Sequence, residues 1–344
     1  MSIGREDLLE DIVKIGVRPG DCLALGVSLR SIGWIEGGPD ALIDALLDAV
    51  GEDGTIFIPS FTRAFNLPLS RRKRLRVFGS GGGEVAPWNY IYDPGKTPPE
   101  TGAVPVAMWR RDDSIRSRHP TNSVIAMGRL AEFITRDHDA IALKFLPYYR
   151  LLEVQGRGLF MGLQGRLVGL RHLSQLEAGL VDILPPTLGV RYLGEDGSLG
   201  IYRRSKSGCT IRLPELNKEM IEEDLILEGR VGNADSMLVD AAGAVERMAR
   251  SLKDDPRVNL CRRYHCLWCR ELERKYNLFD GIDNPAFFQK SGIMRHATFR
   301  LNDMRMRNSY LAECLSKLLS VMISISEGCH PGLDVYTYSS RSNP

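Results

Sequence analysis

The spacing of hydrophobic residues predicts helices that alternate with buried strands along most of the chain. Leu8, Leu9, Ile12 and Val13 recur at helical spacing and are followed by a turn at 16–20. Continuous apolar runs bounded by turn residues are typical of strands covered on both faces. Further elements predicted in this way are strands at 21–25, 55–59, 124–127 and 158–161, helices at 40–50, 104–110, 130–135, 170–180 and 238–252, and a hairpin of 190–193 with 199–202. The alternation predicts an α/β fold, a layered α/β/α domain around a central mixed sheet.

Two segments depart from this pattern and determine the predicted domain organisation. Arg71–Arg76 is a dense basic run before the glycine-rich stretch 79–83, so we expect a basic, glycine-rich loop insertion at 67–92. Past residue 255 the content of cysteine, arginine, methionine and aromatic residues rises. The predicted parts are a main domain at 1–255, a mainly helical, cysteine-containing extension at 256–332, and a flexible tail at 333–344. An apolar helical pattern at 308–326 favours packing against the main domain or a second subunit, so a homodimer through the C-terminal helices is one hypothesis.

The composition is that of an ordinary globular protein and excludes several functional classes. The chain has 344 residues, of which 43% are hydrophobic and 26% charged. Its formal net charge of +2 provides no bulk electrostatic basis for binding nucleic acid. The apolar stretch at 311–325 is interrupted by Glu313 and Lys317, and the N-terminal residues lack the apolar region of a signal peptide. Seven cysteines without an extracellular framework are consistent with reduced thiols. We therefore expect a cytoplasmic protein whose partners include neither nucleic acid nor a membrane.

Three segments, in consistent order, carry a resemblance to a known enzyme family. They are Leu23–Thr62, a stretch from Tyr92-Asp93-Pro94 to Ser117–Val124, and a stretch from Leu151 through Gly162 to His172. With a weaker match at 229–234, they span about residues 5–253. In these segments the chain resembles the aminoglycoside 3-N-acetyltransferases, whose namesake activity is antibiotic resistance. The resemblance implies an N-acetyltransferase that uses acetyl-coenzyme A as co-substrate and transfers acetyl directly to an amine of a small-molecule acceptor, an amino sugar.

The loop after the first predicted strand is the candidate donor site. A loop of small residues between a strand and a helix exposes N–H groups, and the dipole of the following helix favours phosphate. From its spacing alone, an ordinary strand-to-helix turn is the favoured interpretation of this loop. The resemblance implies that Ser28, Leu29, Arg30 and Ser31 bind the pyrophosphate of acetyl-coenzyme A. It also implies that the segment containing His119, Ser123 and Val124 lies near the thioester and the pantetheine arm.

A catalytic base is needed because an aliphatic amine is mostly protonated at neutral pH and must lose a proton before it attacks a thioester. Histidine is the side chain best suited to that task. In the family, a histidine ten residues after a strand-ending glycine takes this role, and the same spacing from Gly162 leads to His172. The resemblance therefore implies His172 as the base, with His119 as a second candidate catalytic residue. A single histidine on a predicted helix is, without that resemblance, more often structural.

The chain departs from the family at two positions near these candidates. Gly26 stands where the family usually has a histidine, and Gln175 stands where a glutamate usually follows the catalytic histidine. These departures motivate an alternative function, a catalytically weakened member that acts as a scaffold for coenzyme A or a sugar.

The predicted acceptor site is basic rather than acidic. The family's acidic cluster, which binds polycationic aminoglycosides, falls at Tyr202–Lys206 in this chain. We predict that Arg203, Arg204 and Lys206 bind the substrate. Such a surface repels a polycation and attracts an anion. The hypothesis is therefore an acidic or nucleotide-linked amino sugar as acceptor, with an aminoglycoside as the other possibility.

The segment Cys261–Cys269 contains four potential metal ligands: Cys261, His265, Cys266 and Cys269. Thiolates with imidazole suit zinc or an iron–sulfur cluster, but the spacing lacks the two pairs of a zinc finger. The segment also has the pattern of an amphipathic helix that continues to Tyr276, and a free cysteine is commonly a small buried apolar residue. The packed helix is the favoured interpretation, so no metal is expected. The metal-bearing alternative predicts stoichiometric zinc or iron on this segment.

Overall fold

The computed structural model describes residues 2–67, 89–180, 183–194, 196–205, 208–261, 266–276 and 278. All of them belong to one compact unit, Met1–Phe279. Residues 68–88 of the predicted insertion, the predicted helix at 308–326, the predicted tail and the hypothetical dimer contacts lie outside the described residues. Among the described residues, no helix is long and apolar enough to cross a membrane.

A seven-stranded mixed sheet forms the centre of this unit, in the order β10-β11-β7-β1-β2-β6-β5. The inner strands β7, β1 and β2 are parallel, and the outer strands run antiparallel to their neighbours. The strands are β1 Cys22–Val27, β2 Thr55–Pro59, β5 Ile115–Arg116, β6 Val124–Gly128, β7 Arg157–Met161, β10 Ile226–Val231 and β11 Ala234–Asp240. Val27 pairs with Met161 at the carboxyl ends of β1 and β7, so the loops that follow these two strands meet.

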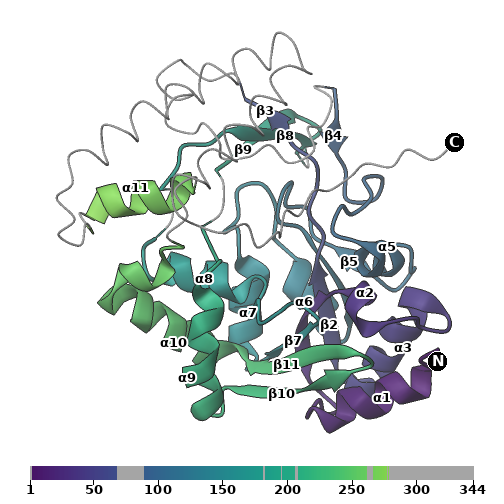
Figure 1. The fold of residues 1–344 in the computed structure, drawn as a ribbon. Coiled ribbons are helices and arrows are strands. Elements are labelled where there is room, and N and C mark those ends of the chain that lie inside the picture. The colour runs from purple at the N-terminus through teal and green to yellow at the C-terminus, as the bar shows by residue number, and fades with distance from the viewer. Residues whose placement is uncertain are drawn as a thin grey trace, which may run out of the picture. The chain divides into compact units, whose positions relative to one another are not determined.

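Helices cover both faces of the sheet, because its strands place alternate side chains in two separate cores (Figure 1). In β1, Leu23 and Leu25 belong to one core, and Cys22 and Ala24 belong to the other. The first core is closed by α1 Arg5–Lys14, α3 Gly38–Val50 and α5 Ala103–Trp109, and the second by α6 Ala131–Thr135, α7 Leu146–Glu153, α8 Leu170–Glu177, α9 Asn217–Glu222 and α10 Ala241–Asp254. The predicted α/β/α layering around a mixed sheet is confirmed.

A second, smaller sheet lies apart from the central one (Figure 1). Its strands are β3 Phe65–Asn66, β4 Ile91–Tyr92, β8 Leu188–Leu193 and β9 Leu199–Arg204. Strands β8 and β9 form the predicted antiparallel hairpin. In the described residues, β8 also pairs with β3 and β4, so this sheet joins segments that are far apart in the sequence.

The chain beyond α10 packs back onto the rest of the unit. It continues as the 3-10 helix η2 Pro256–Asn259 and the helix α11 Leu267–Tyr276. A third apolar core joins Trp268 and Leu272 of α11 to Leu180, Leu213 and Leu252. The first part of the predicted extension therefore shares a core with residues that precede position 255.

Elements that differ from the sequence prediction include the start of α10 and the helix α7. The helix predicted at 238–252 begins at Ala241, because Leu238–Asp240 complete strand β11. Asp240 ends the strand and caps the helix, since its Oδ1 accepts a hydrogen bond from the Gly243 N–H at 3.0 Å. Helix α7 was not among the predicted elements, because only eight residues, with Pro147 in the first turn, carry its pattern.

Candidate functional site

A pocket of about 330 Å³ lies where α8, β9, α11 and the loop at 142–145 meet. Its wall includes His172 and Gln175 from α8, Tyr202 and Arg204 from β9, and Trp268 from α11. Such a concave site, with aromatic walls and a few convergent polar groups, has the general features of a small-molecule binding site.

Hydrogen bonds of Gln175 determine which nitrogen of His172 carries the proton. The Gln175 Nε2 amide donates to the carbonyl oxygen of Cys209 at 2.7 Å and to Oδ1 of Asn259 at 3.2 Å. The Gln175 Oε1 atom is therefore the one that meets His172 Nδ1, at 2.9 Å, and it can only accept. His172 is thus protonated at Nδ1, and the lone pair of Nε2 is left to take a proton from a substrate.

The surroundings of His172 favour its neutral form. Burial, with smaller contributions from the nearby cations Lys144, Arg171 and Arg204, lowers the pKa of His172 to about 4, although the hydrogen bond to Gln175 acts in the opposite direction. The ring of Phe145 stacks against the imidazole at 6.3 Å between centroids. At neutral pH the side chain is therefore unprotonated at Nε2, which is the state that a general base requires.

The charge of the pocket wall is positive. Lys144, Arg203 and Arg204 line it, and none of the described lining residues is acidic. Burial lowers the pKa of Arg204, whose buried Nε has no hydrogen-bond partner. Because successive strand residues point to opposite faces, the half-buried Arg204 and Tyr202 share one face of β9, and Arg203 is exposed. Lys206 lies outside the described residues.

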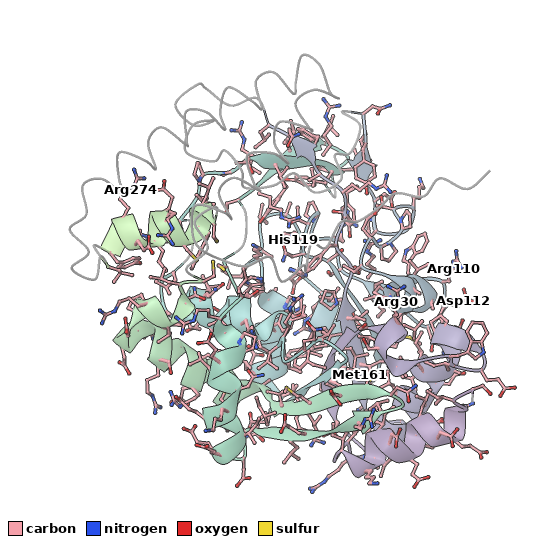
Figure 2. The ribbon with its side chains drawn as sticks, viewed as in Figure 1. Arg30, Arg110, Asp112, His119, Met161 and Arg274 are labelled. Carbon is pink, nitrogen blue, oxygen red and sulfur yellow. The ribbon has the colours of Figure 1, made fainter. Side chains whose placement is uncertain are left out.

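His119, labelled in Figure 2, is buried and is not among the residues that line the pocket. Its Nδ1 accepts hydrogen bonds from the N–H groups of Thr121 at 3.2 Å and Asn122 at 3.0 Å. Burial, with smaller contributions from His138 and Lys144, lowers the pKa of His119 to about 3. Its ring meets the Tyr202 ring edge-on at 4.8 Å between centroids. The structure therefore places His119 where it supports Tyr202, without contact to the pocket space.

The loop after β1 packs against the loop after β7. Ser28 and Ser31 share a hydrogen bond of 2.7 Å between their hydroxyls, and Ser31 Oγ donates to the Gly162 carbonyl at 3.3 Å. A Cβ added at Gly162 would lie 2.3 Å from Ser31 Cβ, and its φ is +69°, so glycine is required there. The helix that follows, α2 Leu29–Ile32, has four residues, so it adds little dipole to the loop. Anion binding here would depend on the hydroxyls and on the backbone N–H groups of Leu29 and Arg30 at the start of α2.

Two further predicted cofactor residues lie inside the protein. Ser123 and Val124 are both buried at the start of β6. Ser123 Oγ donates to the Ser60 carbonyl at 2.7 Å and accepts from Arg116 Nε at 3.3 Å. In this structure the two side chains hold the strand end in place, and neither lies in the pocket that contains His172.

The absence of a histidine at position 26 has a packing explanation. A Cβ added at Gly26 would lie 2.7 Å from the Phe160 ring and 2.7 Å from Leu163 Cδ1. Phe160 and Leu163 therefore occupy the space that a side chain at position 26 would need.

Of the predicted site residues, His172 and Arg204 line this pocket, but sequence reasoning missed the residues that define their surroundings. Tyr202 is named in the sequence analysis only as the first residue of the basic segment Tyr202–Lys206, with no role of its own. Trp268 falls in the predicted C-terminal extension rather than in the main domain. Gln175 was noted as a departure, while its link to Cys209 and Asn259 could not be found from the sequence. The alternation along β9 was the one signal that could have paired Tyr202 with Arg204.

Comparisons with known proteins agree on one family. The family model described as aminoglycoside 3-N-acetyltransferase matches residues 25–253. Aminoglycoside N(3)-acetyltransferase VII of Streptomyces paromomycinus is 28% identical over 264 residues, which are 71% of this chain and 89% of that protein. Aminoglycoside N(3)-acetyltransferase VIII of Streptomyces fradiae is 29% identical over 266 residues, with the same coverage of 71% and 89%.

Solved structures agree with this result. The apoenzyme of aminoglycoside acetyltransferase AAC(3)-IVa has a TM-score of 0.63 at 26% identity, over 80% of this chain and 98% of that one. A variant of that enzyme, solved in complex with a gentamicin, has a TM-score of 0.61 at 26% identity, over 76% and 92%. AAC-IIIb, solved as a binary complex with CoASH, shares the fold with a TM-score of 0.59 at 23% identity, over 74% and 97%.

Proposed function

Because this chain belongs to the aminoglycoside 3-N-acetyltransferase family, we propose that it transfers acetyl from acetyl-coenzyme A to an amine of an anionic amino sugar, with His172 as the base. The acceptor is an acidic or nucleotide-linked sugar in this proposal. The observation that carries it is the position of His172 Nε2, an available proton acceptor, in a pocket lined by cations and by no described carboxylate.

The chemistry is a direct transfer between two bound substrates. His172 Nε2 accepts the proton of the acceptor amine as its nitrogen attacks the thioester carbonyl carbon. A C–N bond forms, the C–S bond breaks, and the proton held by His172 passes to the departing sulfur of coenzyme A. Gln175 keeps the imidazole in the correct tautomer, as the family's glutamate would, but without a negative charge to stabilise the imidazolium.

The donor side follows from the meeting of the two loops after β1 and β7. We assign the pyrophosphate of acetyl-coenzyme A to Ser28–Ser31, and the solved complex of the related AAC-IIIb with CoASH supports coenzyme A as a ligand of this fold. Ser123, Val124 and His119 then act as positioning residues, because all three are buried.

The acceptor side follows from charge. Arg204 lines the pocket, its buried Nε has no hydrogen-bond partner, and no described carboxylate influences its pKa. A variant of the related AAC(3)-IVa has been solved with a gentamicin and with apramycin, both of which are polycations. A polycation would meet Lys144 and Arg204 here, whereas a carboxylate or phosphate would be attracted.

The test measures coenzyme A release by chromatography with a panel of acidic, nucleotide-linked and neutral amino sugars and gentamicin-like amines. His172→Gln should lower kcat/KM by about 10²–10⁴-fold. Arg204→Gln should lower kcat/KM by roughly 10–100-fold for an acidic acceptor alone, since a hydrogen bond to a charged group is worth about 1.5–3 kcal/mol. Arg250→Gln removes the same charge from the exposed face of α10 and should leave kcat/KM unchanged for every acceptor.

Robust acetylation of gentamicin-like amines without turnover of acidic sugars would refute the assignment of an anionic acceptor, while the assignment of acetyltransferase activity would stand. The alternative function, a scaffold, is favoured by Gln175 in place of glutamate. Binding of coenzyme A by calorimetry, with no release from acetyl-coenzyme A on any acceptor, would support the scaffold.

A further inference from the structure

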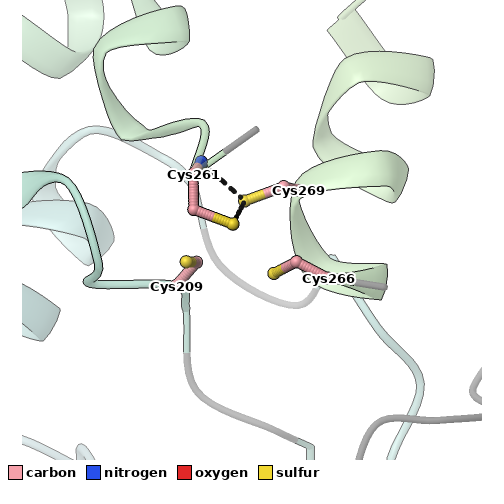
Figure 3. Close-up of side chains that lie close together, drawn as sticks. All are labelled: Cys209, Cys261, Cys266 and Cys269. Atoms are coloured by element: carbon pink, nitrogen blue, oxygen red, sulfur yellow. Dashed lines mark hydrogen bonds between the residues drawn. The ribbon is translucent and has the colours of Figure 1, made fainter. Parts of the chain in front are cut away.

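Four cysteines from separate parts of the chain meet at one point of the third apolar core (Figure 3). Cys209 follows β9, Cys261 follows η2, and Cys266 and Cys269 lie at the start of α11. Their four Sγ atoms all lie within 4.8 Å of one another, and the Sγ atoms of Cys261 and Cys269 are 3.6 Å apart. Cys209, Cys261 and Cys269 are buried, Cys266 is half-buried, and none of the four is in a disulfide.

We propose that Cys209, Cys261, Cys266 and Cys269 bind a structural zinc ion as four thiolates. Zinc in a structural site is bound tetrahedrally with Zn–S distances of about 2.3 Å, which place the sulfurs about 3.8 Å apart. The Cys261–Cys269 separation of 3.6 Å is close to that value and no separation exceeds 4.8 Å, so little movement closes the shell. In a four-iron cluster each thiolate binds a different iron, which requires sulfurs spread further apart than these.

The hydrogen bonding of the cluster also suits a metal site. The backbone N–H of Cys261 donates to Cys269 Sγ at 3.4 Å. Bonds of this kind orient ligands and stabilise the charge of a metal-bound thiolate. Zinc also offsets the mutual repulsion that four thiolates at this spacing would otherwise have.

A purely apolar role for these cysteines explains less of the structure. Of the packed helix expected from the sequence at Cys261–Tyr276, the part Leu267–Tyr276 is present as α11, Cys261 lies outside it, and Trp268, Cys269 and Leu272 form its buried face. An apolar role does not, however, require sulfurs from three segments to converge on a common centre. Of the ligands considered from the sequence, His265 lies outside the described residues, and Cys209, some fifty positions earlier, completes the set.

The zinc ion would stabilise one wall of the pocket. Cys209 presents its carbonyl oxygen to Gln175 Nε2 at 2.7 Å, and Gln175 in turn holds His172. Trp268, between two of the ligands in sequence, lines the same pocket. The zinc ion would therefore help to position Gln175 and Trp268. Only this positioning role, and not the zinc site itself, rests on the proposed function. The transfer reaction itself needs no metal.

The test uses the full chain, purified under reducing conditions without a metal-affinity tag, and measures bound metals by mass spectrometry. We expect about one zinc per chain. Cys209→Ser and Cys269→Ser should each lower the zinc content at least several-fold. Cys22→Ser changes a buried cysteine of β1 outside the cluster and should keep the full content. If the cluster variants do not fold, cobalt added to chelator-treated wild type should bind once per chain, with the spectrum of a tetrahedral tetrathiolate.

The zinc site would be overturned if the purified wild-type protein contained no metal, its cluster thiols reacted freely with a thiol reagent, and it bound no cobalt. Iron in place of zinc would overturn the zinc assignment. Zinc content does not depend on turnover, so a correct zinc site in a protein without acetyltransferase activity would refute only the proposed function. In an active enzyme, removal of zinc should lower kcat and change the pH profile that His172 controls.

Discussion

The protonation state of His172 can be tested directly, because a single side chain, Gln175, accepts the hydrogen bond from its Nδ1–H. Burial lowers the pKa of His172 from its usual 6.5 to about 4. At about 1.36 kcal/mol per unit, the folded protein disfavours the imidazolium by roughly 3 kcal/mol. The Gln175→Glu change places a carboxylate at the atom now 2.9 Å from Nδ1. An opposite charge at that distance should raise the pKa by about 1–3 units.

The assay is an NMR titration of histidine-labelled protein, with the His172 signal assigned from the His172→Gln variant. Wild-type His172 should titrate near pH 4, and the Gln175→Glu variant should titrate between about 5 and 7. The acid limb of kcat/KM should move in the same direction. Gln155→Glu adds the same charge at an exposed position and serves as the control.

A wild-type His172 that titrates near 6.5 would refute the argument from burial. An unchanged pKa in Gln175→Glu would refute the hydrogen bond between the two side chains. The variant also loses the amide donor to Cys209 and Asn259, so its unfolding free energy should fall by about 1–3 kcal/mol. Urea unfolding at pH 7 measures that loss independently.

Three further predictions concern stability, and each is measured by urea unfolding. Gly162→Ala should lower the unfolding free energy by about 1–3 kcal/mol, because the added Cβ would overlap Ser31 and the backbone φ at position 162 is positive. A change below about 0.5 kcal/mol would contradict the close approach of the loops after β1 and β7. Gly26→Ala should cost about 1–3 kcal/mol and be partly rescued by Phe160→Leu, while strict additivity in the double variant would contradict the overlap. Burial lowers the pKa of His119 to about 3 and that of His138 to about 4, so below pH 6.5 the unfolded chain binds more protons than the folded protein does. The stabilisation from the two neutral rings is fully present above that pH, and the unfolding free energy should fall by about 2 kcal/mol for each histidine at pH 5. Equal unfolding free energies at pH 7 and pH 5 would contradict the burial of both rings.

The sequence by itself determined the inner strands and the α/β/α layering of this protein. The apolar runs at 55–59 and 158–161 became β2 and β7, and the amphipathic segment at 40–50 became α3, because periodicity is a local property of consecutive residues. Register with the family also led to His172 and to the basic segment that contains Arg204.

Tertiary structure alone decided what surrounds those residues. The tautomer of His172 depends on Gln175, whose amide is oriented by Cys209 and Asn259, far away in the sequence. The enclosure of His119 depends on packing against Tyr202 from the small sheet. The meeting of Cys209 with three cysteines near α11 likewise depends on how the chain returns to the main unit. Spacing along a chain reports neighbours only within one helix or strand, whereas chemistry at a site depends on contacts that the whole fold brings together.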